Sequence, residues 1–250
     1  MIGSIDLQKL ANKNGIDKFT VLREYVQILF LNSLYLYPEA KGLVFKGGTA
    51  LRFFANSPRF SEDLDFTSSL SEKEIDILCQ KVTKDIKKDV EDIQIKDLET
   101  IAGISKKIYV NTDISPQPLT VKLDFSEREN VMNTKIGIIK TTLPILGTTP
   151  IIYLDPKEIF AEKIRAIMTR HKGRDLFDLW FLIHNSQTLL DIKLIQKKLD
   201  FYKERFDLKK LKKTISEWNE KDLHEDLNKF LPLPNRTIIG QIKNLILAEL

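Results

Sequence analysis

Hydrophobic positions in the first quarter of the chain change their spacing twice. Residues 18–37 carry apolar side chains mainly at helical spacing and are followed by a proline, so this segment predicts a helix. The short apolar run 43–45 ends at Gly47 and Gly48, and residues 49–55 are compatible with a short helix. This pattern is typical of a strand, a glycine turn and a helix.

Other segments alternate polar with apolar residues, as half-buried strands do. Residues 63–66 alternate in this way, and Ser71 with Glu74 then resembles a capping box that opens a helix to about Val90. Further strand-like runs, separated by Gly, Pro and Asn, occupy residues 93–95, 104–110, 119–125 and 151–154. These runs predict a mixed or antiparallel sheet.

The pattern changes near residue 150 to long amphipathic helices. Asp155 is suited to the N-cap of the first helix and Pro156 to its first position. The expected helices cover residues 156–170, 175–185, 191–203, 207–218 and 236–249. We therefore predict an α/β (α+β) fold with a first domain at residues 1–150 and a helical second domain at residues 151–250.

Composition adds few constraints to this picture. The 250 residues are 42% hydrophobic, which is enough for a substantial core, and the formal net charge is only +4. That mild excess is compatible with an anionic substrate such as a nucleotide or RNA, but ordinary enzymes share it. Cys79 has no cysteine partner and is expected in the core, and the three histidines show no metal-ligand or triad spacing.

Targeting signals are not visible. The N-terminus lacks a basic segment followed by an apolar run, so a cytoplasmic location is expected. The uninterrupted apolar segments are all shorter than the roughly 20 residues that span a bilayer, so we predict no membrane partner.

Asp63 and Asp65 are the first candidate metal ligands. Two residues apart on a strand, they lie on the same face, about 6–7 Å apart along the backbone. Adjacent carboxylates require a cation or hydrogen-bond donors, and Mg²⁺ prefers oxygen ligands together with phosphate. Taken alone, such a pair is more often a solvated strand edge.

The Gly47-Gly48 turn strengthens the metal-site interpretation. Exposed backbone N–H groups at the start of the helix that Thr49 begins favour a phosphate, although a tight turn without a ligand is the alternative. In the loop before the aspartates, Arg59 and Ser61 are further candidates to contact phosphate oxygens.

Asp124 supplies a third carboxylate on the strand-like run 121–125, where it shares a face with Lys122. Three carboxylates that hold two metal ions would clamp a triphosphate and activate an attacking hydroxyl. The alternative is a surface ion pair between Lys122 and Asp124.

Four segments together resemble the motifs of the AbiEii family of nucleotidyltransferase toxins, within the DNA polymerase β-like nucleotidyltransferase superfamily. The first motif resembles KGGTAL at residues 46–51 with RFSEDLDF at residues 59–66, and the second resembles KLDF at residues 122–125. Later motifs resemble residues 158–170 and 174–180. The spacing between Gly48 and Asp63 is slightly longer than in the general superfamily pattern, and the helices after about residue 190 match no motif.

The resemblance implies a role for each matched residue. Asp63 and Asp65 would bind two Mg²⁺ ions, and Asp124 would complete the site and help to deprotonate the acceptor hydroxyl. Lys163 would contact the nucleotide phosphates, whereas without the motif it reads as a solvated lysine. Asp178 and Arg174 would brace Lys163 or the substrate, with a structural cap or ion pair as the alternative for Asp178.

By the same resemblance, the chain would transfer a nucleoside monophosphate from an NTP to an acceptor hydroxyl and release pyrophosphate. It would be the toxin of a toxin–antitoxin or phage-defence system with a cognate antitoxin, and RNA such as the tRNA 3′ end would be the acceptor. The basic cluster at residues 209–213 is a candidate RNA contact or simply a solvated helix face. A small-molecule or protein hydroxyl is the alternative acceptor, and a non-catalytic nucleotide-binding regulator is disfavoured because all three acids are present.

Overall fold

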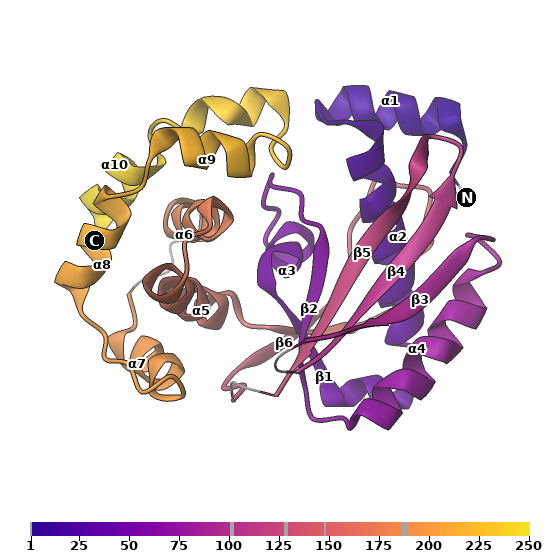
Figure 1. Cartoon of the computed structure of the whole chain (residues 1–250), viewed down its shortest axis with the longest axis horizontal. Coiled ribbons are helices and arrows are strands. Elements are labelled where there is room, and N and C mark those ends of the chain that lie inside the picture. The colour runs from indigo at the N-terminus through magenta and orange to yellow at the C-terminus, as the bar shows by residue number, and fades with distance from the viewer. Residues whose placement is uncertain (1, 101–102, 128–129, 148, 187–189) are drawn as a thin grey trace.

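A computed structural model of the chain describes residues 2–100, 103–127, 130–147, 149–186 and 190–250 (Figure 1). The described residues form one mixed sheet of seven strands with helices around it. The strands are β1 (Leu43–Lys46), β2 (Asp63–Ser68), β3 (Ile93–Leu98), β4 (Ile104–Thr112), β5 (Ser115–Ser126), β6 (Thr134–Gly137) and β7 (Ile151–Leu154). The α-helices are α1 (Ser4–Asn14), α2 (Lys18–Leu34), α3 (Gly47–Phe54), α4 (Glu72–Ile86), α5 (Pro156–Thr169), α6 (Gly173–Ser186), α7 (Ile192–Asp200), α8 (Leu208–Ser216), α9 (Glu220–Leu227) and α10 (Ile242–Glu249). Two 3-10 helices cover Pro38–Gly42 and Leu233–Ile238.

The strand order in the sheet is β3-β4-β5-β2-β1-β7-β6. Strand β2 pairs in parallel with β5 and antiparallel with β1, and β1 pairs in parallel with β7. The remaining neighbours are antiparallel. This order puts β2 between β1 and β5, and the chemistry of the site depends on these three strands.

Alternation along β2 separates a packed face from a polar face. Leu64 and Phe66 are fully buried, and the Phe66 ring stacks on that of Phe125 with 5.1 Å between ring centroids. Burial of each such side chain contributes roughly 1.5–3 kcal/mol to stability. Asp63 and Asp65 consequently lie on the opposite face, which makes them available to ligands.

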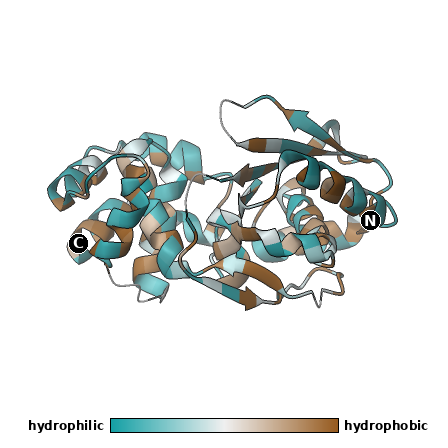
Figure 2. Ribbon diagram, turned by 90° about the horizontal axis from the view of Figure 1, so that it is seen from below, coloured by the Kyte–Doolittle hydropathy of each residue, from teal (hydrophilic) through white to brown (hydrophobic). Residues whose placement is uncertain are grey.

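The two sides of the sheet carry different helices. Helices α2 and α4 pack against each other and against β5 and β3. The helices after β7 gather in a separate layer, in which α5 contacts α6, α7 and α8 (Figure 1). Figure 2 shows hydrophobic and hydrophilic stretches alternating along these helices, as expected for elements packed on one side only.

Most of the predicted elements are confirmed. Every strand-like run forms a strand of the one sheet, and the capping box of Ser71 with Glu74 is present. The Asp155 side chain accepts a hydrogen bond from the Lys157 N–H, with Pro156 at the first helical position. Cys79 is buried in the core as expected. The 151–154 strand belongs to the sheet, and the division into domains near residue 150 stays a prediction.

Several predicted helices are too long. The 191–203 helix ends at Asp200 because Lys203 has a φ of +57°, which lies outside the right-handed helical region. The 236–249 segment is divided: the chain forms a 3-10 helix over Leu233–Ile238 and begins α10 only at Ile242. The 207–218 and 18–37 helices likewise end earlier, at Ser216 and Leu34.

Two α-helices and one strand escaped prediction because their sequences are too polar for a clear pattern. In α9 only Leu223 and Leu227 are buried, and strand β6 is largely exposed. Helix α1 likewise buries only Leu7 and Ala11. Within the described ranges, no helix is long and apolar enough to cross a membrane.

Candidate active site

The register of three neighbouring strands brings the predicted acids together. Asp65 on β2 is paired with Asp124 on β5 and with Lys46 on β1. Asp63 is paired in the same way with Lys122. Residues paired in register on neighbouring strands share a face of the sheet, so Asp65 and Asp124 lie side by side, and their common metal site stays a prediction.

The carboxylate of Asp65 on β2 lies against Gly47, the first residue of α3. Gly47 has a φ of +81°, and a Cβ on it would lie 2.3 Å from Asp65 Oδ2. Glycine is therefore required there both by backbone conformation and by the close approach of the carboxylate. Burial, followed by the charges of Asp63 and Asp124, raises the pKa of Asp65 to about 6.

Asp63 is anchored through its backbone. The Thr49 hydroxyl donates to the Asp63 carbonyl oxygen at 2.5 Å, which ties α3 to β2. Burial raises the pKa of Asp63, Arg174 opposes the rise, and Glu62 adds to it. Thr49, a candidate phosphate contact, is itself buried and serves this structural bond.

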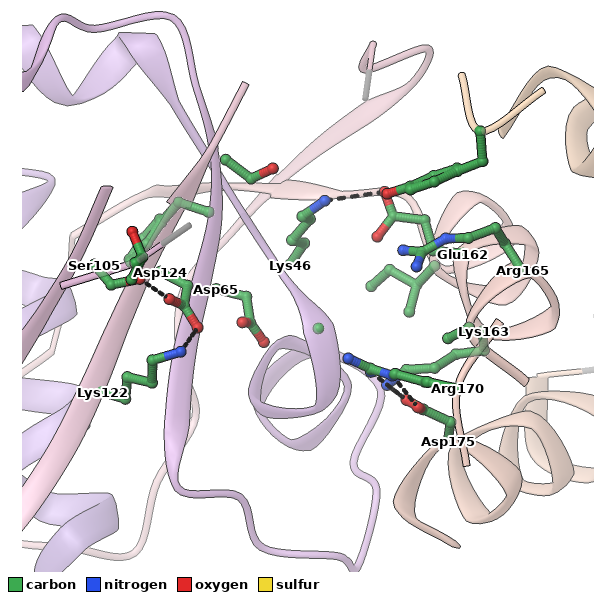
Figure 3. Close-up of a pocket in the computed structure, with 17 residues that line it drawn as sticks. Lys46, Asp65, Ser105, Lys122, Asp124, Glu162, Lys163, Arg165, Arg170 and Asp175 are labelled. Atoms are coloured by element: carbon green, nitrogen blue, oxygen red, sulfur yellow. Dashed lines mark hydrogen bonds and ion pairs between the residues drawn. The ribbon is translucent and has the colours of Figure 1, made fainter. Parts of the chain in front are cut away.

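The Asp124 carboxylate already has two partners (Figure 3). Ser105 Oγ donates to it from β4, and Lys122 Nζ lies 2.7 Å from Asp124 Oδ2. The Lys122–Asp124 ion pair considered from the sequence is thus present. Among the side chains that the structure describes, no three acids, histidines or cysteines are grouped closely enough to hold a metal ion as they stand.

Lys163 on α5 is buried, so the solvated lysine expected without the motif is wrong, and its contact with nucleotide phosphates stays a prediction. Its Nζ lies 2.9 Å from Asp175 Oδ1 and 2.7 Å from Asp178 Oδ2, both on α6. Burial alone would lower the pKa of Lys163, but the charges of Asp175 and Asp178 outweigh it, and the pKa is raised. Lys163 is therefore a fixed cation at the edge of the site.

Asp178 is held between two cations, Arg59 and Lys163. It is fully buried, and Arg59 binds it through both guanidinium edges, Nε to Oδ1 at 2.8 Å and Nη2 to Oδ2 at 2.9 Å. Despite its burial, Arg59 and Lys163 lower the pKa of the Asp178 carboxyl. This geometry is compatible both with the bracing of Lys163 and with the structural ion pair considered for Asp178, and a catalytic role for Asp178 stays a prediction.

Arg59 also differs from its prediction as a phosphate contact. It is 2% exposed, its Nη1 donates to the Phe60 carbonyl oxygen at 2.9 Å, and it does not line the site cavity. Gly48 serves the same packing, because a Cβ there would lie 2.0 Å from Arg59 Nη2. Ser61 has its carbonyl bonded to Gln27 Nε2 and is not among the residues that line the site cavity.

A cavity of about 630 Å³ opens beside Asp65 and Asp124. Its other wall carries cations from α5 and from the segment that follows it, including Lys163 and Arg170 (Figure 3). Arg170 binds Asp175 at 2.7 and 2.9 Å. A cavity of this size and polarity suits a nucleotide, with carboxylates on one side and cations on the other.

Sequence reasoning gave no role to several lining residues. Lys46 Nζ lies 3.2 Å from Glu162 Oε1, and the Arg165 guanidinium carbon lies 4.8 Å from the centroid of the Tyr202 ring. Lys46 had a usable signal, since it directly precedes the glycine turn. Tyr202 had none, because it follows α7 in a region without motifs.

Arg174 does not brace Lys163, one of the two roles considered for it. Its Nη1 lies 3.8 Å from Glu62 Oε2, on the Asp63 side of the site. The three histidines stay outside the chemistry, and His171 stacks on Trp218 with 3.6 Å between ring centroids.

Comparison with known proteins agrees with the geometry. The family model described as nucleotidyl transferase AbiEii toxin, type IV toxin–antitoxin system, matches residues 29–236. MenT4, a nucleotidyltransferase toxin from Mycobacterium tuberculosis, is 18% identical with a TM-score of 0.70, over 100% of this chain and 91% of that one. JHP933 from Helicobacter pylori is 22% identical with a TM-score of 0.56, over 93% of this chain and 94% of that one.

No curated protein sequence matches the chain. The two solved structures share its fold at low identity, and the family match covers most of the length. The chain belongs to the AbiEii family of nucleotidyltransferase toxins of type IV toxin–antitoxin systems.

Proposed function

We propose that the chain transfers a nucleoside monophosphate from an NTP to a hydroxyl of RNA, with Mg²⁺ bound at the aspartates. The observation that carries this proposal is the cavity in which Asp65 and Asp124 face Lys163 and Arg170. Opposed carboxylates and cations suit a metal-bound triphosphate better than they suit a neutral substrate.

The donor set fits Mg²⁺, because Asp63, Asp65 and Asp124 offer only oxygen ligands on one face of β2 and β5. Asp65 has its pKa raised to about 6 by burial and by the neighbouring acids, so a cation there would relieve the repulsion. Asp124 would exchange its Lys122 partner for the metal. When bound, two Mg²⁺ ions would neutralise the phosphates and the developing charge of the leaving group.

Side chains of the protein would bind the phosphates and accept the proton of the acceptor hydroxyl. Lys163 and Arg170 hold the phosphates as fixed cations, each oriented by Asp175. Asp124 takes the proton of the acceptor hydroxyl, whose oxygen bonds to the α-phosphorus. The bond from that phosphorus to the bridging oxygen breaks, and pyrophosphate leaves.

The partners follow partly from the family. A type IV toxin implies a cognate antitoxin and an NTP substrate. RNA, with the tRNA 3′ end as the proposed acceptor, rests on the resemblance and on the in-line chemistry. On α8, Lys210 and Lys213 are exposed beside Glu204 and Glu217, so this basic cluster is partly neutralised by its own neighbours.

The test uses purified chain, Mg²⁺, each labelled NTP and small RNA from a bacterial extract. Label should enter RNA with release of pyrophosphate, and chelation of the metal or Asp65→Asn should abolish both. Label in protein or a small molecule instead would favour the alternative acceptor. Absence of any metal-dependent use of NTP would refute the catalytic proposal itself.

A further inference from the structure

A second charged cluster lies beside Asp63, outside the residues that line the cavity. At its centre Glu62 contacts three cations from separate parts of the chain. Arg23 Nη1 on α2 lies 3.5 Å from its carboxylate, Arg174 Nη1 on α6 lies 3.8 Å away, and Lys229 Nζ after α9 lies 3.9 Å away. We refer to Arg23, Arg174 and Lys229 as the basic triad.

The basic triad carries more charge than its partner neutralises. In the part of the chain that the structure describes, Glu62 is the one carboxylate within 4.0 Å of these three cations. All three distances exceed those of a tight charge-assisted bond, which is about 2.7–2.9 Å. The triad therefore retains a net positive field at the surface, where Lys229 is 63% exposed.

The fold holds the basic triad in position. Arg23 Nε donates to the Thr120 carbonyl of β5 at 3.1 Å. Arg174 and Lys229 both lie over the ring of Phe230, at 5.0 and 4.7 Å from its centroid. Phe230 is itself buried, and its carbonyl accepts from the Phe60 N–H at 2.8 Å, in the loop that leads to β2.

The position of the triad relative to the cavity suggests what it binds. Asp65 lines the cavity, whereas Asp63 directly follows Glu62 and interacts electrostatically with Arg174. The paired aspartates therefore lie between the cavity and the basic triad. In-line displacement requires the attacking oxygen and the leaving group on opposite sides of the phosphorus. If the triphosphate occupies the cavity, the acceptor approaches from the side of the triad.

We propose that the basic triad binds backbone phosphates of the acceptor RNA strand next to its reacting hydroxyl. This inference rests on the proposed function. It gives the segment after α9 a role, since Lys229 would contribute to acceptor binding. It also assigns Glu62 as an internal counter-charge that the strand displaces.

The experiment compares charge changes of equal size at two surfaces. Lys229→Gln removes a triad cation, and Lys213→Gln on α8 removes a similarly exposed lysine, 76% against 63%, that also has one glutamate nearby. Glu62→Gln makes the opposite change within the triad. Wild type, the three variants and Arg174→Gln are assayed for binding of a single-stranded RNA oligonucleotide over a salt series, and for KM of RNA and of NTP.

Lys229→Gln and Arg174→Gln should each weaken RNA binding, by about three- to tenfold at low salt, and reduce the salt slope by about 0.7 per lost phosphate contact. Glu62→Gln should tighten binding, and KM for NTP should stay near the wild-type value in the Lys229 variant. Equal RNA binding in wild type and both triad variants, or a loss confined to Lys213→Gln, would overturn the inference. Failure of wild type to label any RNA would instead overturn the proposed function.

Discussion

Two groups of aspartates in this molecule have opposite electrostatic environments. On β2, Asp65 faces other acids, and its pKa is raised to about 6 by burial and by Asp63 and Asp124. On α6, Asp178 is no less buried, yet Arg59 and Lys163 keep its pKa below the usual range. Asp175 follows the same pattern, because Lys163 and Arg170 outweigh its burial.

The difference separates a ligand site from its support. Acids that repel one another gain from binding a cation, so the β2 group trades folded stability for function. Acids that are fully paired gain nothing from a ligand, and the α6 group instead fixes the cations that face the cavity. Sequence motifs do not distinguish the two groups, since both are conspicuous runs of Asp with apolar residues.

The largest expected effect is a loss of folded stability on substitution in the α6 group. Asp178→Asn leaves the buried Arg59 without its carboxylate partner, which costs roughly 3–5 kcal/mol, whereas Lys163 keeps Asp175. For a chain of this size, the melting temperature should fall by about 6–20 °C. Thermal melts with Glu217→Gln as control measure this, because the exposed Lys213–Glu217 pair should leave the melting temperature unchanged. A fall of less than about 2 °C in Asp178→Asn would contradict the bracing role.

The second expected effect is a gain in folded stability, in the variant Asp65→Asn. Because the folded pKa of Asp65 is raised from 3.8 to about 6, the folded state binds the proton more tightly and loses stability as pH rises through that interval. Asp65→Asn should remove this loss and stabilise the metal-free protein by about 1–3 kcal/mol at pH 7.5, with little change at pH 4. Nucleotide transfer should be lost.

Melts of both proteins in chelator at the two pH values provide the measurement for Asp65→Asn. A variant less stable than wild type at pH 7.5 would mean that Asp65 is a structural residue.

The smallest effect concerns the contact between the turn and the acid. Gly47→Ala introduces a Cβ 2.3 Å from Asp65 Oδ2 at a φ of +81°, so we expect a cost of about 1–2 kcal/mol and a displaced carboxylate. Transfer activity should fall more than stability does. Gly3→Ala is the matched control, since its nearest new neighbour lies 4.0 Å away and its φ is −68°. Equal activity in the two variants would show that the approach of Gly47 to Asp65 is unimportant.

The acids of the site were predictable because local patterns encode them. Alternation fixes the face of Asp63 and Asp65 relative to Leu64, and the same argument applies to Asp124 beside Lys122. The parallel register of β2 with β5 then places Asp124 next to Asp65. Any strand pairing that preserved the buried apolar face would have left the acids on the polar one.

The roles of Arg59 and Tyr202 were not predictable, because they depend on distant segments. Arg59 reads as a loop cation until α6 buries it against Asp178, 119 residues away. Tyr202 reaches the cavity only because α7 ends at Asp200 and the chain turns back. The predicted end of α7 was wrong for a local reason. The spacing of apolar residues does not show the positive φ of Lys203, which ends the helix.

The parallel pairing of β1 with β7, which joins Phe45 to Tyr153, also has a consequence for the time at which the toxin becomes active. Closing so long a loop is slow, and a chain emerging from the ribosome presents β1 well before its partner. Lys163 and Asp178 emerge later still, and Arg59 has no buried carboxylate to bind until they do. The nascent chain would thus carry its metal ligands from early in synthesis while lacking the opposing wall. The opposing wall, and with it the complete site, would form only after the residues of α6 have been synthesised.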